Sequence, residues 1–134
     1  MNITYKDTKN FTPKDLQELF LSVEWSSGHY PEKLVIAMKN SGAVFTAWDN
    51  DRLIGLINIL DDGAMTAYIH YLLINPEYQG KGIGKELVRL TSDKYKEYLR
   101  IVLIAYNTEI EFYQKSGFAV GEKTTPMYIT TLWT

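Results

Sequence analysis

The chain has 134 residues and a mass of 15.4 kDa, a length that suits one compact domain over residues 1–134. Hydrophobic residues make up 46% and charged residues 22%, a mixture typical of a soluble globular protein. The absence of cysteine excludes disulfide bonds, thiol catalysis and zinc sites built on thiolates. A formal net charge of -2 argues against a protein that binds nucleic acid through bulk positive charge.

The apolar runs of the sequence are much shorter than the roughly 20 residues that a membrane-spanning helix needs. Residues 1–10 also lack the cationic and then apolar pattern of a secretory leader. We therefore expect a cytoplasmic protein that contacts neither membranes nor nucleic acid, and we expect no metal site.

The first elements in chain order are a short strand and two helices. Met1–Tyr5 alternates weakly and predicts the strand, Thr12 and Pro13 predict the start of one helix, and Pro31 begins the other. Apolar residues recur at helical spacing in both helices: Leu16, Leu19, Phe20 and Val23 in the first, and Leu34, Val35 and Met38 in the second. The residues between them, Trp25–Tyr30, interrupt this pattern and predict a loop.

The middle of the chain predicts a strand meander followed by a long helix. Turn residues at 49–52 separate two strand patterns, which indicates a hairpin. The predicted elements are the strands Ala43–Trp48, Leu53–Leu60 and Thr66–Ile74, and the helix Gly82–Tyr98 with its stripe Ile83, Leu87, Thr91, Tyr95 and Tyr98.

The last part of the chain predicts a further strand, a short helix and two final strands. Arg100–Ala105 is nearly all apolar, as expected of a strand buried on both faces. Thr108 can cap a helix over Glu109–Lys115, and strands are predicted at Phe118–Val120 and Met127–Leu132. The apolar stretch Tyr128–Trp133 can either complete the sheet, which we favour, or pair across a dimer. The order β-α-α-β-β-β-α-β-α-β-β predicts an α/β (α+β) fold with a mixed, mostly antiparallel sheet flanked by helices.

The strongest chemical signal is a strand that runs into a glycine-rich turn, which in turn opens the long helix. Gly80, Gly82 and Gly84 have no side chains, so their amides can approach a ligand closely. The amides at a helix start lack partners and favour anions, and a pyrophosphate suits such a site. Lys81 and Lys85 add positive charge nearby.

Two other phosphate-binding patterns fit this turn poorly. A P-loop needs Ser or Thr after its lysine, whereas Glu86 follows Lys85. The spacing of Gly80, Gly82 and Gly84 also differs from the dinucleotide-binding fingerprint. A merely structural helix cap is a third interpretation, but three glycines in five residues make a costly cap.

The segment Gln79-Gly-Lys-Gly-Ile-Gly84 resembles the Gln/Arg-x-x-Gly-x-Gly/Ala signature of the GCN5-related N-acetyltransferase (GNAT) superfamily. The preceding Leu72-Leu-Ile-Asn-Pro-Glu-Tyr78 and the later Asn107 and Phe112-Tyr-Gln-Lys-Ser-Gly-Phe118 resemble two further family motifs. The predicted order of elements is also similar to that of the family. The resemblance implies the GNAT fold, with a splayed sheet, and direct transfer of an acetyl group from acetyl-CoA to an amine.

Acetyl-CoA is then the cosubstrate, with its pantetheine arm along the strand at Leu72 and Ile74 and its pyrophosphate on the glycine-rich turn. The resemblance implies these cofactor-binding residues: Leu72, Leu73, Ile74, Gln79, Gly80, Lys81, Gly82, Ile83, Gly84, Lys85, Asn107 and Tyr113. Asn107 also reads as a simple loop residue before the Thr108 cap.

Two residues are candidates for proton transfer. Tyr113 matches the position of a family tyrosine near the thioester sulfur, where it can act as general acid; its alternative role is packing beside Phe112. His70, which is expected to share a strand face with Tyr68, Leu72 and Ile74, is a candidate general base. A packed or surface histidine is an equally good interpretation of His70.

The acceptor side is expected at the loop Trp25–Tyr30, where Trp25 and Tyr30 can stack on an amine substrate. A buried Trp25 that fixes the turn between the helices is the alternative. Three functions remain open: acetylation of a small-molecule primary amine, acetylation of a protein N-terminus or lysine, and binding of acyl-CoA without catalysis. The protein is expected to be a monomer or a homodimer.

Overall fold

The computed structural model describes residues 2–134, which form a five-stranded sheet in the order β1-β2-β3-β4-β5. The strands are β1 (Ile3–Asp7), β2 (Ala43–Asp49), β3 (Arg52–Asp61), β4 (Thr66–Ile74) and β5 (Arg100–Leu103). Neighbouring strands pair antiparallel from β1 to β4, and β4 pairs with β5 in parallel. The α/β class and the mixed, mostly antiparallel sheet are therefore confirmed.

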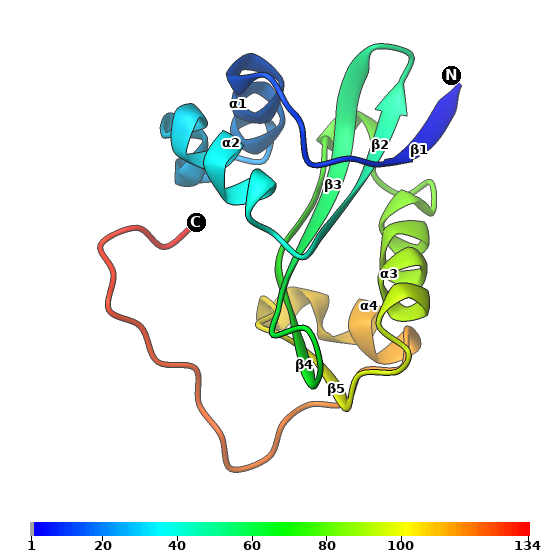
Figure 1. Cartoon of the computed structure of the whole chain (residues 1–134), viewed down its shortest axis with the longest axis vertical. Helices are drawn as coiled ribbons and strands as arrows, with labels where there is room; N and C mark the ends of the chain where they lie inside the picture. The colour runs from blue at the N-terminus through cyan, green and yellow to red at the C-terminus, as the bar shows by residue number, and fades with distance from the viewer. Residues whose placement is uncertain (1) are drawn as a thin grey trace.

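Helices cover both faces of this sheet (Figure 1). The α-helices are α1 (Pro13–Ser22), α2 (Pro31–Lys39), α3 (Ile83–Lys94) and α4 (Ile110–Lys115), and the 3-10 turns are η1 (Ser26–His29), η2 (Pro76–Tyr78) and η3 (Asn107–Glu109). Helices α1 and α2 pack on the face that carries Val44, Leu56 and Leu73. Helix α3 packs on the opposite face, against residues such as Phe45 and Ile57.

The predicted starts of α1 and α2 hold in the structure, whereas α4 begins at Ile110 without a side-chain cap, so the predicted cap at Thr108 is wrong. The Thr12 hydroxyl accepts a hydrogen bond from the Asp15 amide at 3.1 Å, and Pro13 occupies the first turn of α1. Helix α3 ends at Lys94 rather than at the predicted Tyr98, because the chain turns there to enter β5. The Tyr95 hydroxyl donates to Asp61 at 2.6 Å and fixes this turn against β3.

The predictions for the C-terminal part are wrong in two respects. Strand β5 ends at Leu103 and is not buried on both faces, since the Val102 side chain is 40% exposed. Residues 116–134 contain no helix or strand, so neither predicted final strand is present and Tyr128–Trp133 does not complete the sheet. Strand-forming residues need a neighbouring strand for their hydrogen bonds, and this segment has none within residues 2–134. Figure 1 shows it as an open loop that returns to the body at its end.

None of the helices in residues 2–134 combines the length and the apolar character that crossing a lipid bilayer requires.

Candidate functional site

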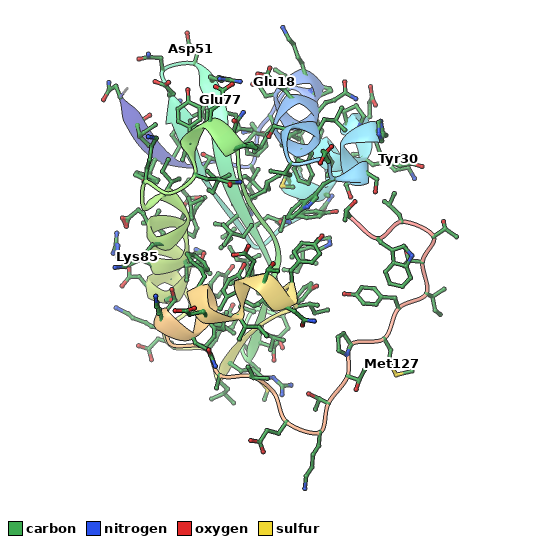
Figure 2. All side chains as sticks on the ribbon, turned by 180° about the vertical axis from the view of Figure 1, so that it is seen from behind. Glu18, Tyr30, Asp51, Glu77, Lys85 and Met127 are labelled. Carbon is green, nitrogen blue, oxygen red and sulfur yellow. The ribbon has the colours of Figure 1, made fainter. Side chains whose placement is uncertain are left out.

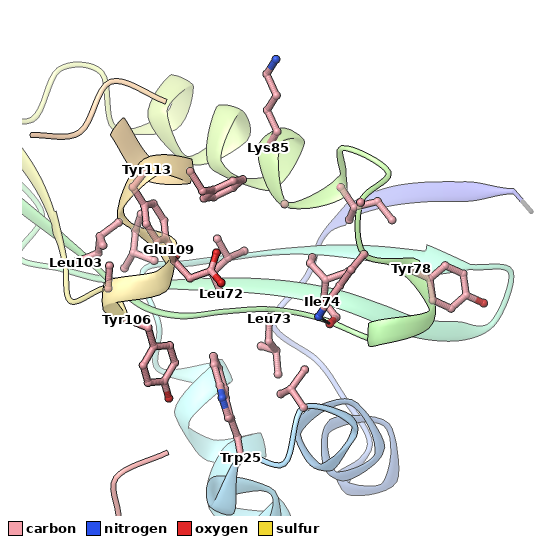
Figure 3. A pocket seen from close by; sticks show the side chains of 18 of the residues that line it. Trp25, Leu72, Leu73, Ile74, Tyr78, Lys85, Leu103, Tyr106, Glu109 and Tyr113 are labelled. Carbon is pink, nitrogen blue, oxygen red and sulfur yellow. Dashed lines mark hydrogen bonds between the residues drawn. The ribbon is translucent and has the colours of Figure 1, made fainter. Parts of the chain in front are cut away.

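The sheet opens between β4 and β5. The two strands pair only from Thr66 with Arg100 to Ile69 with Leu103, and β4 then continues to Ile74 paired with β3 but not with β5. A cavity of about 650 Å³ lies at this opening. Its walls come from the free part of β4, the start of α3, the end of β5 and α4 (Figure 3).

The main chain of β4 presents free hydrogen-bonding groups to the cavity. Tyr71 and Asn75 direct their amides toward β3, where they donate to Asn58 Oδ1 at 3.0 Å and to the Ile54 carbonyl at 2.8 Å. Successive residues of a strand point to opposite edges, so Leu72 and Ile74 direct theirs toward the opening. The Ile74 carbonyl accepts a hydrogen bond from Gln79 Nε2 at 3.0 Å, which ties the glycine-rich turn to the strand.

Two glycines of the glycine-rich turn adopt a backbone conformation that other residues rarely adopt. Gly80 and Gly82 have φ angles of 76° and 83°, in the left-handed region that favours glycine. A Cβ atom at either position would meet nothing within 4 Å, so conformation rather than space selects glycine there. Gly84 has an ordinary φ, and its Cβ would lie 3.5 Å from Phe112 Cζ, at normal contact distance.

Gly82 caps α3, and the first turn of that helix offers unpartnered amides. The first of its hydrogen bonds runs from the Glu86 amide to the Gly82 carbonyl, at 3.1 Å. No acceptor within residues 2–134 engages the amides of residues 80–85. This arrangement, with the helix dipole behind it, is suited to an anion. The two predicted lysines add less positive charge to the cavity than the sequence suggested. Lys81 does not line the cavity, and the Lys85 side chain points away from it (Figure 3).

Tyr113 lies on α4 and lines the cavity. Its ring packs edge-on against Phe112 and Phe118, with centroid separations of 5.0 Å and 5.8 Å. Burial, followed by the negative charge of Glu109, raises the pKa of Tyr113 to about 12. The phenol therefore keeps its proton at neutral pH, as a proton donor must.

His70 lines the cavity from a β-bulge in β4. The register shifts there: Asn58 of β3 faces Tyr71, whereas the next residue, Ile59, faces Ile69, which leaves His70 as the extra residue. The expected alternation of His70 and Tyr68 with Leu72 and Ile74 is therefore wrong. Leu72 and Ile74 pack on the α3 side, whereas Tyr71 packs with α1 and α2. The extra residue in the bulge therefore places His70 and Tyr68 on the opposite face of the sheet from Leu72 and Ile74.

The surroundings of His70 favour a neutral imidazole. Its ring stacks on Tyr71 at a centroid distance of 4.0 Å and on Tyr68 at 5.8 Å. Partial burial lowers the pKa of His70 below its ordinary value of 6.5. At pH 7 the imidazole is therefore mostly unprotonated and able to accept a proton.

Aromatic rings continue from His70 toward Trp25 at the turn between α1 and α2. Trp25 lines the cavity, with centroids 6.0 Å from Tyr71 and 6.3 Å from Tyr106. Trp25 also packs edge-on against Phe20 at 6.2 Å, so it both supports the helix turn and faces the cavity. Figure 3 shows the Trp25 and Tyr106 side chains next to each other.

The structure gathers most of the residues that the sequence indicates. Those that line the cavity are Trp25, His70, Leu72, Leu73, Ile74, Gln79, Gly80, Gly82, Ile83, Gly84, Lys85 and Tyr113. Lys81, Asn107 and Tyr30 are not among the lining residues, and the Tyr30 side chain is 48% exposed.

Sequence reasoning missed lining residues at the end of β5 and on η3 and α4: Leu103, Ile104, Ala105, Tyr106, Glu109 and Phe112. It also missed Tyr78, which lines the cavity and donates its hydroxyl proton to Asp49. The position of these residues in the predicted fold could have indicated them, because ligands bind beyond the carboxyl ends of neighbouring parallel strands.

Comparison with known proteins identifies the family. Residues 10–118 match the family model of the acetyltransferase (GNAT) family. An uncharacterised ycf52-like N-acetyltransferase from Prochlorococcus marinus is 36% identical over 115 residues, which cover 81% of this chain and 63% of the relative. A histone acetyltransferase from Glycine max is 32% identical, over 78% of this chain and 50% of the relative. The chain thus spans between half and two thirds of the length of these two relatives.

Solved structures agree with this comparison. A GNAT-family acetyltransferase from Streptococcus pneumoniae has a TM-score of 0.84 and 27% identity, covering 97% of this chain and 99% of that one. Glucosamine-6-phosphate N-acetyltransferase from Arabidopsis thaliana has a TM-score of 0.70 at 14% identity, over 95% of this chain and 99% of that one, a likeness of fold alone. The chain therefore belongs to the acetyltransferase (GNAT) family of enzymes.

Proposed function

We propose that this chain is an N-acetyltransferase that transfers the acetyl group of acetyl-CoA directly to a primary amine, in a single domain over residues 1–134. The observation that carries the proposal is the cavity where the free edge of β4 meets the unpartnered amides of α3, with Tyr113 on its wall. Membership of the GNAT family supports the same activity.

The residues around the opening fit acetyl-CoA. The amides of residues 80–85 suit its pyrophosphate, and the Leu72 and Ile74 amides and the Leu72 carbonyl suit the amide groups of its pantetheine arm, which would add to the sheet edge like a strand. A cavity of about 650 Å³ lies within the size range of small-molecule sites. When bound, acetyl-CoA supplies an activated acyl group as a thioester.

The residues of the chain then supply proton transfer and orientation. The neutral amine attacks the thioester carbonyl, so that a C–N bond forms and the C–S bond breaks. His70 accepts the proton that the amine must lose, directly or through water. Tyr113 donates its hydroxyl proton to the departing sulfur. Both groups are in the required protonation state at neutral pH, because the pKa of His70 is lowered and that of Tyr113 is raised to about 12.

The acceptor is proposed to be a small amine with an aromatic or apolar body. Trp25 and Tyr106 line the cavity with ring centroids 6.3 Å apart, and Trp25 also lies 6.0 Å from Tyr71, the ring on which His70 stacks. Such rings offer apolar area to a substrate and attract an ammonium group as it arrives. The position of Tyr106 adds a residue to this wall, whereas the exposed Tyr30 lies outside the cavity lining.

A protein amine is the second candidate acceptor. It is favoured by the name of the Glycine max relative, a histone acetyltransferase. A module that binds acyl-CoA without catalysis is less well supported, because such a module needs no protonated phenol beside the thioester. A cytoplasmic location remains a prediction.

Calorimetry with CoA and a thiol-release assay test the proposal together. CoA is expected to bind and to raise the melting temperature at saturating concentration, and amines with aromatic bodies are expected to release CoA from acetyl-CoA faster than hydrophilic amines. Faster turnover of a lysine-containing peptide would favour the protein acceptor. Binding without turnover of any amine would favour the binding module, and the absence of CoA binding would overturn the proposal.

A further inference from the structure

The C-terminal segment, defined here as residues 127–133, has the sequence of a strand but no strand partner. It reads Met-Tyr-Ile-Thr-Thr-Leu-Trp, rich in the branched and aromatic residues that favour strands. Within residues 2–134, the main chain from 119 to 133 makes no backbone–backbone hydrogen bond. Its hydrogen bonds within the segment are local ones between Thr130 and Leu132.

The apolar side chains of the C-terminal segment are exposed to an unusual degree. Ile129 is 106% exposed, Met127 91% and Trp133 67%. In a strand, Met127, Ile129 and Trp133 would point to one face and Tyr128 and Leu132 to the other. Apolar residues on both faces are typical of a strand that is covered on both sides. So much unburied apolar surface marks a contact site in a folded protein.

Within residues 2–134, the sheet of the same chain has an edge without a neighbour. Strand β5 is the last in the sheet order, and only its β4 side is paired. The residues along and after it are apolar and partly exposed, with Val102 at 40% and Ile104 at 47%. An unpaired edge of this kind is a template for an added strand.

The chain's own segment is held away from that edge. Thr134 is fixed to η1, where its carbonyl accepts hydrogen bonds from the Ser27 amide and from the hydroxyls of Ser26 and Ser27, each at 2.8 Å. Phe118 is fixed at the other end, where its amide donates to the Tyr113 carbonyl at 3.0 Å. Figures 1 and 2 both show the chain between these points as a loop clear of the body, with Met127 on it.

We infer that the protein is a dimer in which the C-terminal segment of each copy adds to the open edge of β5 of the other copy. The exchange is reciprocal, so it closes with two-fold symmetry and leaves neither edge free. Each segment carries five large apolar side chains that are 40% to 106% exposed, so two segments with their two receiving edges bury an area on the order of the roughly 1,200 Å² of a specific interface. The added strand also braces the end of β5, which forms one wall of the cavity.

Substitution at Ile129 tests the inference against a matched control. Light scattering after size exclusion, over a dilution series, is expected to show a dimer for the unmodified chain. Ile129→Glu is expected to raise the dimer dissociation constant by about 100-fold or more, because it places a carboxylate between packed apolar groups. Ile36→Glu makes the same change at another exposed isoleucine, 60% exposed on α2, and is expected to leave the dimer intact.

Cross-linking distinguishes exchange from pairing within one chain. The chain has no cysteine, so Val102→Cys can be combined in one chain with Tyr128→Cys, Ile129→Cys or Thr130→Cys without background. Exchange predicts disulfide-linked dimers on oxidation for at least one combination, because paired strands bring Cα atoms within about 7 Å.

Three results would overturn the inference: a monomer throughout the dilution series, a dimer that Ile129→Glu leaves unchanged, or a disulfide that forms within one chain. None of these readouts depends on enzymatic activity, so the inference and the proposed function are tested separately.

Discussion

His70 and Tyr71 are neighbours in the chain, yet their rings stack with centroids 4.0 Å apart on the same side of the sheet. Successive residues of a regular strand point to opposite faces. The bulge removes that alternation by leaving His70 without a counterpart on β3. It also coincides with the point where β4 separates from β5, so one irregularity accompanies both the opening of the sheet and the placement of the candidate base.

Replacement of His70 is expected to change the pH profile of the reaction. Because its pKa lies below 6.5, the unmodified chain should lose kcat/KM as the pH falls through that pKa and the imidazole becomes protonated. His70→Gln should lower kcat by about 100-fold and remove this acidic limb. The other histidine gives the control, since His29→Gln on η1 should keep both the rate and the limb. An acidic limb that persists in His70→Gln would exclude His70 as the base.

Replacement of Tyr113 is expected to affect the chemical step and to leave binding intact. Tyr113→Phe keeps the ring contacts with Phe112 and Phe118 and removes only the hydroxyl. We expect a loss of kcat of about 100-fold or more, with CoA affinity within a factor of about two. Tyr5→Phe on β1, outside the cavity lining, makes the same change and should have no effect. A wild-type kcat in Tyr113→Phe would assign the proton donor elsewhere.

The glycine-rich turn permits a comparison of two glycines with similar backbone conformations. Gly82 and Gly63 have φ angles of 83° and 81°, and a Cβ atom at either would meet nothing within 4 Å. Alanine at each should therefore cost a similar free energy of unfolding, about 1 kcal/mol. Only Gly82→Ala should weaken CoA binding, by about tenfold, because it disturbs the amides at the start of α3. Equal CoA affinities in the two variants would contradict an anion site there.

Asn58 is expected to support the bulge that presents His70. It is completely buried, accepts the Tyr71 amide at 3.0 Å and donates to the Ser41 hydroxyl at 3.1 Å. Asn58→Leu leaves the Tyr71 amide without its acceptor and should cost about 1–3 kcal/mol in denaturant unfolding. It should also shift the pH limb assigned to His70. Ser41→Ala leaves the Tyr71 contact in place and should leave the pH profile unchanged.

Tyr106 is expected to contribute to acceptor selectivity. Its side chain is 54% exposed, so Tyr106→Ala should cost little stability. We expect the KM for aromatic amines to rise about fivefold, since a stacking contact is worth roughly 1 kcal/mol, with the affinity for CoA unchanged. Tyr30→Ala, at a tyrosine of similar exposure outside the cavity lining, should not alter the KM. If Tyr30→Ala raised the KM and Tyr106→Ala did not, Tyr30 rather than Tyr106 would belong to the acceptor side.

Local patterns in the sequence were sufficient to predict the hairpin at 49–52, the capped start of α1 and the glycine-rich turn before α3. These features depend on backbone conformation and on the spacing of apolar residues, which a few neighbouring residues determine. The family resemblance added the candidate roles of Tyr113 and of the turn at 79–85, and most of those residues line one cavity.

Only the tertiary structure decided the position of His70, the extent of β5 and the course of the C-terminal segment. A bulge arises from the register between two strands, and here it is held by the buried Asn58 on the preceding strand, 13 residues from Tyr71 in the sequence. The segment 127–133 has the composition of a strand, but a strand forms only where another strand offers its edge, and the fold holds this segment apart from its own. Composition therefore determined what each segment favours, whereas the available partners in space determined which of those preferences were realised.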